Sequence, residues 1–160
     1  MTLAYVALGA NLGSPIVTVN AAIAHLDAIP DSRRIATSAL YRTAPVGLKN
    51  QPDFINAVAA LETQLTPEAL LARLFAIEAR FGRQRSVPNA PRTLDLDLLL
   101  HGDGVLATTT LTLPHPRMHL RAFVLAPLAE IAADLIVPGR GRVADLLADC
   151  ADQRIERIAA

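Results

Sequence analysis

The sequence contains no tryptophan, only one cysteine and no long run of apolar residues. Because a single cysteine cannot form an intrachain disulfide, a disulfide-stapled fold is excluded, and Cys150 fits a reducing compartment. A membrane-spanning helix needs roughly 20 apolar residues in succession, and no segment approaches that length. The opening residues, MTLAYVALGANLG, carry no basic segment before their short apolar run, which is not typical of a signal peptide. We therefore expect a cytoplasmic protein without membrane association.

An excess of charge of one sign is also missing. The 160 residues include 15 basic and 15 acidic side chains, so the net charge at pH 7 is zero. Proteins that bind nucleic acids or anionic membranes usually carry a surplus of Lys and Arg, and this balance indicates no such partner. Apolar residues make up 52% of the chain. That content can build a hydrophobic core, and we expect one domain over residues 1–160.

Short apolar runs predict strands, and two cap-plus-proline pairs predict helix starts. Ser14-Pro15 and Thr66-Pro67 each place a capping side chain before a proline in the first helical turn. Apolar residues recur at helical spacing after each pair. We expect strands at 3–9, 34–43, 54–63 and 91–100, a hairpin near 104–113, and further helices at 121–132 and 143–149.

The order strand, helix, strand, strand, helix, strand is the ferredoxin-like βαββαβ pattern. It belongs to the α+β class, with an antiparallel sheet that carries its helices on one face. We expect this core, extended by a C-terminal hairpin and extra helices. Such a fold supports many functions, so the function has to be argued from particular residues.

Two aspartates interrupt the most apolar part of the chain, PRTLDLDLLL (91–100). On a strand, Asp95 and Asp97 project from one face while the alternating leucines project from the other. Aspartate is unfavourable in strands, so the pair needs a physical reason. Either this face is solvated, or the two carboxylates hold a metal such as Mg²⁺, which uses one or two carboxylates together with water and phosphate oxygens.

Basic residues precede the aspartate pair in ARFGRQRSVPNAPR, where Arg80, Arg83, Arg85 and Arg92 lie close together. The planar guanidinium suits phosphate oxygens, although such a loop is also common as solvated surface. Next to a carboxylate pair, it supplies the second half of a Mg-nucleotide site. The sequence has no Walker loop, so side chains would have to hold the nucleotide.

Two further titratable residues leave alternatives open. His115 lies between prolines, where a phosphate contact and a structural hydrogen bond are equally plausible. Glu78 lies beside the apolar stripe of the second helix. It is either an ion-pair partner at the edge of the helix or a buried acceptor for a ligand.

The few phenylalanines fall into two groups. Phe75 and Phe81 follow the apolar stripe of the second helix, and we expect both in the core. Phe54 begins a strand and Phe123 begins a helix. These two belong either to the core or to a ligand site, because a flat ring at the end of an element can face a ligand.

Five linked motifs together resemble the 6-hydroxymethyl-7,8-dihydropterin pyrophosphokinase family of folate biosynthesis. They follow the family's order close to its spacing and span about residues 3–138. The motifs are GANLG (9–13), YRTAPVG (41–47), QPDFINAV (51–58), PRTLDLDLLL (91–100) and LPHPRMHLRAFVLAPLAEIA (113–132). The arginine followed by the double aspartate is the most specific of them.

The resemblance implies transfer of a diphosphate group from ATP to the hydroxymethyl group of the pterin, with release of AMP and participation of two Mg²⁺ ions. It makes Asp95 and Asp97 the ligands of both metals and catalytic residues together with Arg83 and Arg92. The implied ATP-binding residues are Glu78, Arg83, Arg85, Arg92, His115 and Arg121. The implied pterin-binding residues are Thr43, Ala44, Val46, Phe54, Asn56 and Phe123, with the two phenylalanine rings on either side of the pterin.

The chain departs from the family pattern at two positions. Asn89 stands where well-studied members carry a tryptophan, and Ala44 stands where the family often has proline. We expect the 83–92 loop to close over MgATP less firmly than in members with the tryptophan, and the turn at Ala44 to be less rigid.

Two other classes of function share this fold. A regulatory module that binds a ligand without turnover needs no metal ligands, so the intact Asp95, Asp97 and Arg92 argue against it. An RNA-binding domain needs paired aromatics on central strands and a basic face, whereas aromatics are 4% of this chain and its net charge is zero. We expect a monomeric enzyme whose partners are ATP and the pterin.

Overall fold

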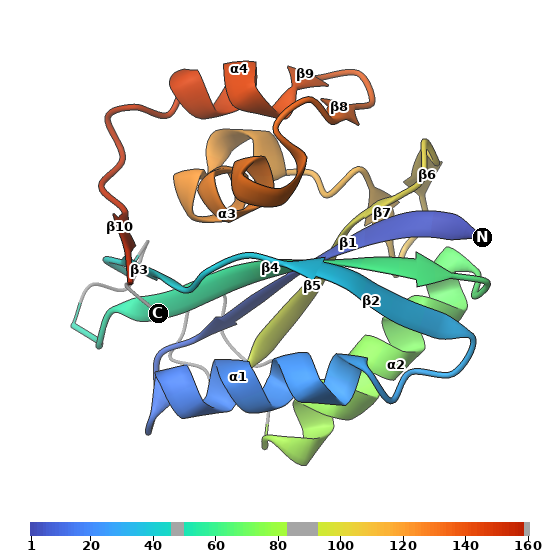
Figure 1. The fold of residues 1–160 in the computed structure, drawn as a ribbon, viewed down its shortest axis with the longest axis horizontal. Coiled ribbons are helices and arrows are strands. Elements are labelled where there is room, and N and C mark those ends of the chain that lie inside the picture. The colour runs from blue at the N-terminus through green and yellow to red at the C-terminus, as the bar shows by residue number, and fades with distance from the viewer. Residues whose placement is uncertain (46–49, 83–92, 159–160) are drawn as a thin grey trace.

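A computed structural model of the chain describes residues 1–45, 50–82 and 93–158 (Figure 1). The ferredoxin-like core consists of β1 (Thr2–Ala10), α1 (Pro15–Leu26), β2 (Ser32–Thr37), β3 (Tyr41–Thr43), β4 (Phe54–Thr63), α2 (Pro67–Arg80) and β5 (Asp95–His101). The remainder forms β6 (Leu106–Ala107), β7 (Thr112–Leu113), a 3₁₀ turn (Met118–Leu120), α3 (Ala122–Ala132), β8 (Ile136–Val137), β9 (Gly141–Arg142), α4 (Val143–Ala148) and β10 (Glu156–Arg157).

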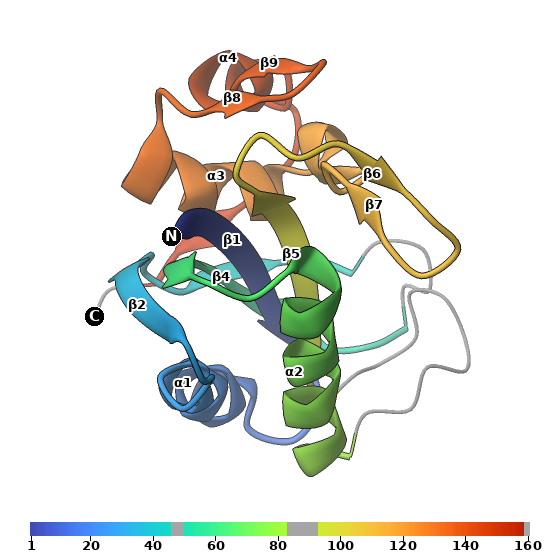
Figure 2. The same cartoon turned by 90° about the vertical axis from the view of Figure 1, so that its right-hand side faces the viewer.

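The main sheet has the order β10-β3-β4-β1-β5, with β2 also pairing with β4, and its pairs are antiparallel. This order confirms the predicted ferredoxin-like core. Helices α1 and α2 lie on one face of the sheet, as predicted (Figures 1 and 2). Helix α3 covers the opposite face and α4 packs on the outer side of α3 (Figure 1), so the molecule has a second helical layer that the sequence pattern did not predict.

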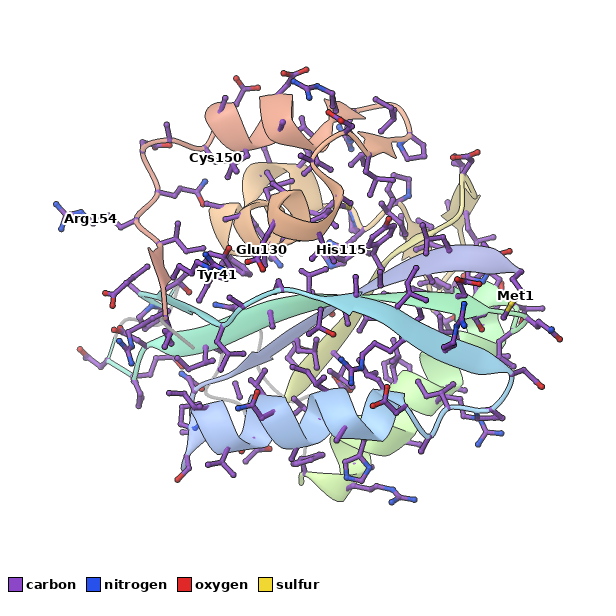
Figure 3. All side chains as sticks on the ribbon, viewed as in Figure 1. Met1, Tyr41, His115, Glu130, Cys150 and Arg154 are labelled. Carbon is purple, nitrogen blue, oxygen red and sulfur yellow. The ribbon has the colours of Figure 1, made fainter. Side chains whose placement is uncertain are left out.

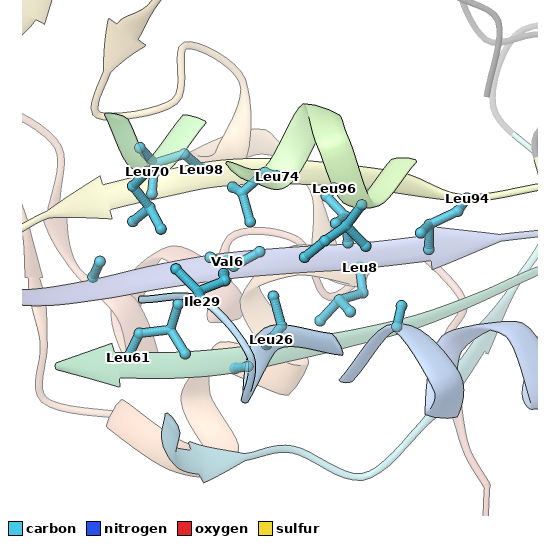
Figure 4. Packing of buried hydrophobic residues seen from close by; sticks show 14 of the residues in the cluster. Val6, Leu8, Leu26, Ile29, Leu61, Leu70, Leu74, Leu94, Leu96 and Leu98 are labelled. Atoms are coloured by element: carbon cyan, nitrogen blue, oxygen red, sulfur yellow. The ribbon is translucent and has the colours of Figure 1, made fainter. Parts of the chain in front are cut away.

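The sheet separates two hydrophobic clusters. Leucines of β5 and α2 pack with apolar residues of β1 and α1 on one face, as Figure 4 shows; the labelled members include Val6, Leu8, Leu26, Leu70, Leu74, Leu96 and Leu98. On the other face, residues of α3 pack on β1 and β4; this cluster includes Tyr5, Val58, Leu99, Leu125 and Leu128. Alternate side chains of the strands therefore belong to the two clusters on opposite faces of the sheet.

Several predicted elements need correction. The strand expected at 34–43 is divided into β2 and β3, because Ser38 between them uses its hydroxyl to accept the N–H of Val58, at 2.9 Å. The hydroxyl takes over a bond that a regular ladder would make between backbones. The short strands β8, β9 and β10 were not predicted, whereas the hairpin β6–β7 and helices α3 and α4 confirm the predicted elements.

The two predicted helix starts differ in how their first turns are satisfied. Thr66 accepts the N–H of Ala69 at 3.2 Å, which is an N-cap bond. Ser14 precedes α1 but makes no side-chain cap bond, so this part of the prediction is wrong.

None of the helices in the described part of the chain combines the length and the apolar character that a bilayer crossing requires.

The different caps predict different costs of truncation. Thr66→Ala should lower the free energy of unfolding by about 1 kcal/mol, because it leaves a helical N–H without its acceptor. Ser14→Ala should change that free energy by less than about 0.5 kcal/mol, because no cap bond is lost. Urea denaturation of both variants measures the difference, and equal losses would contradict the assignment.

Candidate active site

Asp95 and Asp97 lie at the start of β5, on the face of the sheet that α3 covers. Leu96 and Leu98 are buried in the cluster on the α1 and α2 face, and successive side chains of a strand project from opposite faces. Both aspartates are half-buried. The alternation predicted from the sequence therefore holds, and it points the two carboxylates away from the leucine-rich core.

The register of β1 brings this pair onto the same face as Asn56. Gly9 pairs with Asn56 of β4 and with Asp95 of β5, and directly opposed residues share a face. Two strand spacings, about 10 Å, separate Asn56 from Asp95. A Cβ atom on Gly9 would lie 3.0 Å from Oδ1 of Asn56, so the glycine leaves room for this amide between the two strands.

The pterin-binding residues predicted on β3 and β4 also converge. Thr43 pairs with Phe54, and the Nδ2 group of Asn56 donates a hydrogen bond to the hydroxyl of Thr43 at 3.0 Å. Thr43 and Asn56 are buried, whereas Ala44 is exposed. Val46, the remaining residue predicted on this turn, lies outside the described residues.

Asn11 supports the segment that leads into β4, and the sequence analysis did not single it out. It is 1% exposed at the end of β1, and its Nδ2 group donates to Gln51 Oε1 at 2.8 Å and to the carbonyl of Pro52 at 3.0 Å. These bonds fix the segment that leads into Phe54. The motif GANLG contains the residue, but its role depends on a partner far along the chain.

Helix α3 is held over β3 by a polar contact. The hydroxyl of Tyr41 donates to Glu130 Oε1 at 2.6 Å, and the N–H of Ala39 donates to Oε2 at 3.0 Å (Figure 3). Burial, and then the bond to Glu130, raise the pKa of Tyr41 to about 12. This contact fixes the helix whose first turn carries Phe123, and the guanidinium carbon of Arg121 lies 5.4 Å from the centroid of that ring.

The phenylalanines divide differently from the prediction. Phe54 and Phe123 are both half-buried, which agrees with a place at the margin of the core. Phe81 packs against the core as expected. Phe75 is 40% exposed, so its assignment to the core is wrong, because the helical stripe turns it toward the outer side of β5.

Glu78 reaches β5 from α2, on the face of the sheet opposite α3. This residue of α2 is 1% exposed, and its Oε2 atom accepts the backbone N–H of Leu96 at 2.7 Å. Glu78 is therefore buried and not at the edge of the helix, and the donor that it accepts from is a backbone N–H; its predicted contact with a ligand stays a prediction. The donor in this bond is the peptide group that joins Asp95 to Leu96.

His115 contacts the same strand from its outer side. Its backbone N–H donates to the carbonyl of Leu99 at 2.9 Å, and its Nδ1 atom accepts the N–H of Arg117 at 3.2 Å. Burial lowers the pKa of the ring from 6.5 to about 4, with the charges of Arg121 and Arg117 acting in the same direction and Asp95 opposing them. At neutral pH the ring is therefore uncharged, and its proton resides on Nε2.

A cavity of about 240 Å³ opens beside the outer edge of β5. It is bordered by α2, by β5 and by the hairpin segment that leads to His115. Its lining includes Leu71, Phe75, Leu96, Asp97, Leu98, His115, Pro116 and the residues 108–112. The walls are apolar from α2 and hydroxyl-rich from the hairpin, while Asp97 and His115 provide polar groups, a combination that suits a small polar ligand with a flat apolar part.

The arginines predicted to bind ATP, Arg83, Arg85 and Arg92, lie outside the described residues, as does the expected lid at 83–92. Within the described ranges, no group of three or more His, Cys, Asp or Glu side chains is placed to hold a metal. Asp95 and Asp97 are a two-carboxylate donor set. That set fits Mg²⁺, which fills its other positions with water and substrate phosphates.

Comparison with known proteins agrees with this geometry. Residues 5–133 match the family described as 7,8-dihydro-6-hydroxymethylpterin-pyrophosphokinase. A 2-amino-4-hydroxy-6-hydroxymethyldihydropteridine pyrophosphokinase of Pseudomonas aeruginosa is 47% identical over 154 residues, which cover 96% of this chain and 95% of the relative. The protein of the same name from Haemophilus influenzae is 40% identical over 158 residues, which cover 99% of both chains.

Solved structures support the fold. A crystal structure of the Plasmodium falciparum HPPK-DHPS wild type aligns with 95% of this chain at a TM-score of 0.71 and 15% identity. The alignment covers 44% of that longer chain, so the present chain spans less than half of it. The family match and the full-length relatives show that this chain belongs to the 7,8-dihydro-6-hydroxymethylpterin-pyrophosphokinase family.

Proposed function

We propose that this chain transfers the terminal diphosphate of ATP to the hydroxymethyl oxygen of 6-hydroxymethyl-7,8-dihydropterin, producing the pterin diphosphate and AMP. Pyrophosphokinase activity in folate biosynthesis follows from the family and its named relatives. The observation that supports this reaction here is the arrangement of one sheet face. The carboxylates of Asp95 and Asp97 share that face with the Asn56–Thr43 pair, and Asp97 also borders the cavity beside β5.

The substrates would occupy the two sides of the aspartate pair. The pterin has a planar ring with a polar edge, which suits the bonded Asn56–Thr43 pair and the half-buried rings of Phe54 and Phe123. The nucleotide suits the cavity on the other side, because its planar adenine could pack on the apolar wall, its ribose hydroxyls could face the threonines, and its phosphates would point toward Asp97 and His115. The reacting atoms would then meet at the start of β5.

In the reaction, the hydroxymethyl oxygen forms a bond to the β-phosphorus of ATP. The bond from that phosphorus to the oxygen bridging the α- and β-phosphates breaks, and AMP leaves with the bridging oxygen. The hydroxyl proton passes to Asp97 or to solvent. The protein holds the two substrates in line, which by itself can supply much of the rate enhancement.

Asp95 and Asp97 would hold Mg²⁺, and we propose two ions, as the family resemblance implies. When bound there, Mg²⁺ supplies positive charge to the transferred diphosphate and makes the substrate hydroxyl easier to deprotonate. His115 presents an uncharged ring whose Nε2–H can donate to a phosphate oxygen, because Nδ1 already accepts the N–H of Arg117. The guanidinium groups of Arg121 and of Arg83, Arg85 and Arg92 would add charge for the phosphates.

We also propose that the enzyme acts as a monomer in the cytoplasm, where ATP is produced and used. Light scattering coupled to size-exclusion chromatography measures the oligomeric state, and cell fractionation measures the location.

The reaction is tested by its nucleotide product. Incubation with MgATP and 6-hydroxymethyl-7,8-dihydropterin should produce AMP in equal amounts with the pterin diphosphate, because the attack is on the β-phosphorus. Chromatographic separation of AMP, ADP and ATP measures this. ADP as the main product would mean transfer of a single phosphoryl group and would overturn the proposal.

The aspartate pair is tested by isosteric substitution. Asp97→Asn should lower kcat by at least about 10²–10³-fold, because it weakens the hold on Mg²⁺, whose positive charge would stabilise the transition state. Asp103→Asn is the matched control, since Asp103 is exposed in the turn at the other end of β5. Both variants should keep the wild-type thermal midpoint. A fully active Asp97→Asn enzyme would show that this face of β5 is merely solvated.

The depressed pKa of His115 predicts an acid-sensitive contribution to stability. The folded protein binds a proton at this ring only near pH 4, whereas the unfolded chain binds it near 6.5. Between these values the unfolded state carries more protons, so stability falls as the pH drops from 6.5 toward 4. His115→Gln should lose less stability than the wild type across this window, measured by urea denaturation at both ends. Parallel losses in the two proteins would contradict the assignment.

A further inference from the structure

The start of β5 is fixed along an edge that has no strand beside it. Among the described strands, β5 is the last of the main sheet, so its outer N–H and C=O groups need partners from elsewhere. Glu78 accepts the N–H of Leu96 at 2.7 Å, and the N–H of His115 donates to the carbonyl of Leu99 at 2.9 Å. These two bonds lie on either side of Asp97 in the sequence.

The Glu78 bond acts directly on the backbone of the aspartates. The carbonyl of Asp95, the N–H of Leu96 and the Cα atoms of both residues lie in one rigid peptide plane. Fixing the N–H of Leu96 therefore fixes the Cα atom from which the Asp95 side chain departs. Asp97 follows one residue later on the same strand, so its direction depends on the same plane.

The anchor itself is rigid. Glu78 is 1% exposed, and its helix is held in the core by fully buried leucines that include Leu70 and Leu74. A buried carboxylate is costly unless it is hydrogen-bonded, and a bond from an ionised acceptor is stronger than one between neutral groups. A carboxyl group placed in this core is thus more than the filling of space requires.

We propose that Glu78 is a positioning residue that sets the direction of Asp95 and Asp97 through the N–H of Leu96. This inference rests on the proposed function, in which the two aspartates hold the metal. What matters is the reach of the side chain, because the acceptor oxygen must arrive at the amide from a helix on the other side of the sheet. Misplacement of a reacting group by about 1 Å can cost on the order of 10²-fold in rate.

Two substitutions separate the length of the side chain from its carboxyl group. Glu78→Gln keeps the length of the side chain and an acceptor oxygen, so we expect it to lower kcat less than Glu78→Asp does and to keep the Leu96 amide protected. Glu78→Asp keeps the carboxyl group but withdraws the acceptor by one methylene. We expect it to lower kcat on the order of 10- to 100-fold and to raise the required Mg²⁺ concentration.

Thr63→Val is the matched control for the loss of a buried side-chain bond. Thr63 is fully buried at the far end of β4, where its hydroxyl accepts the N–H of Leu65 at 3.0 Å. Its substitution should lower the thermal midpoint while leaving kcat and the Mg²⁺ requirement unchanged. An effect of Glu78→Asp that merely followed lost stability would therefore appear in Thr63→Val as well.

Amide hydrogen exchange measured without substrate or metal provides a readout independent of activity. The Leu96 amide should exchange at least about tenfold faster in Glu78→Asp than in wild type or Glu78→Gln, because one hydrogen bond is lost. Equal exchange rates, an unaffected Glu78→Asp enzyme, or a Glu78→Gln enzyme impaired as strongly as Glu78→Asp would overturn the inference. A wild-type protein that forms no AMP would instead overturn the proposed function, while the exchange result would still test the bond.

Discussion

The pairing of β1 with both β4 and β5 is the constraint on which the site depends. One register places Gly9 opposite Asn56 and Asp95, and it places Ala7 opposite Val58 and Asp97. A shift of one residue would turn the aspartates into the leucine cluster and the leucines toward the substrates. The buried leucines of β5 therefore fix the register that the site needs. Exposing them through a one-residue shift of the strand would cost far more free energy than any interaction at the site could return.

Local patterns were sufficient to predict the core elements and the direction of the aspartates. The alternation in TLDLDLLL places the leucines on one face of the strand and the aspartates on the other, whatever the fold around it. Proline next to a capping residue located both helix starts, although only Thr66 makes the cap bond. The family resemblance, carried by linked motifs, added the substrates, which no pattern of hydrophobicity can specify.

Features that depend on distant partners were not predictable in this way. The hydroxyl of Ser38 divides a strand because Val58 is placed opposite it, and Asn11 acquires its role from Gln51 and Pro52. The sequence left Glu78 as either a helix-edge residue or a buried acceptor, because the apolar stripe of a helix does not show which strand packs against it. The second helical layer likewise follows from how α3 meets β3 through Glu130 and Tyr41, a contact between residues far apart in the sequence.

The occupied outer edge of β5 has a consequence beyond catalysis. An edge strand with the sequence DLDLLLH is a ready template for pairing with a strand of another molecule. The carboxylate of Glu78 takes the N–H of Leu96, the segment at His115 takes the carbonyl of Leu99, and the β6–β7 hairpin lies alongside (Figure 2). Backbone groups already engaged in this way cannot recruit a foreign strand, so the contacts beside the aspartates also guard a leucine-rich edge against intermolecular β-sheet growth.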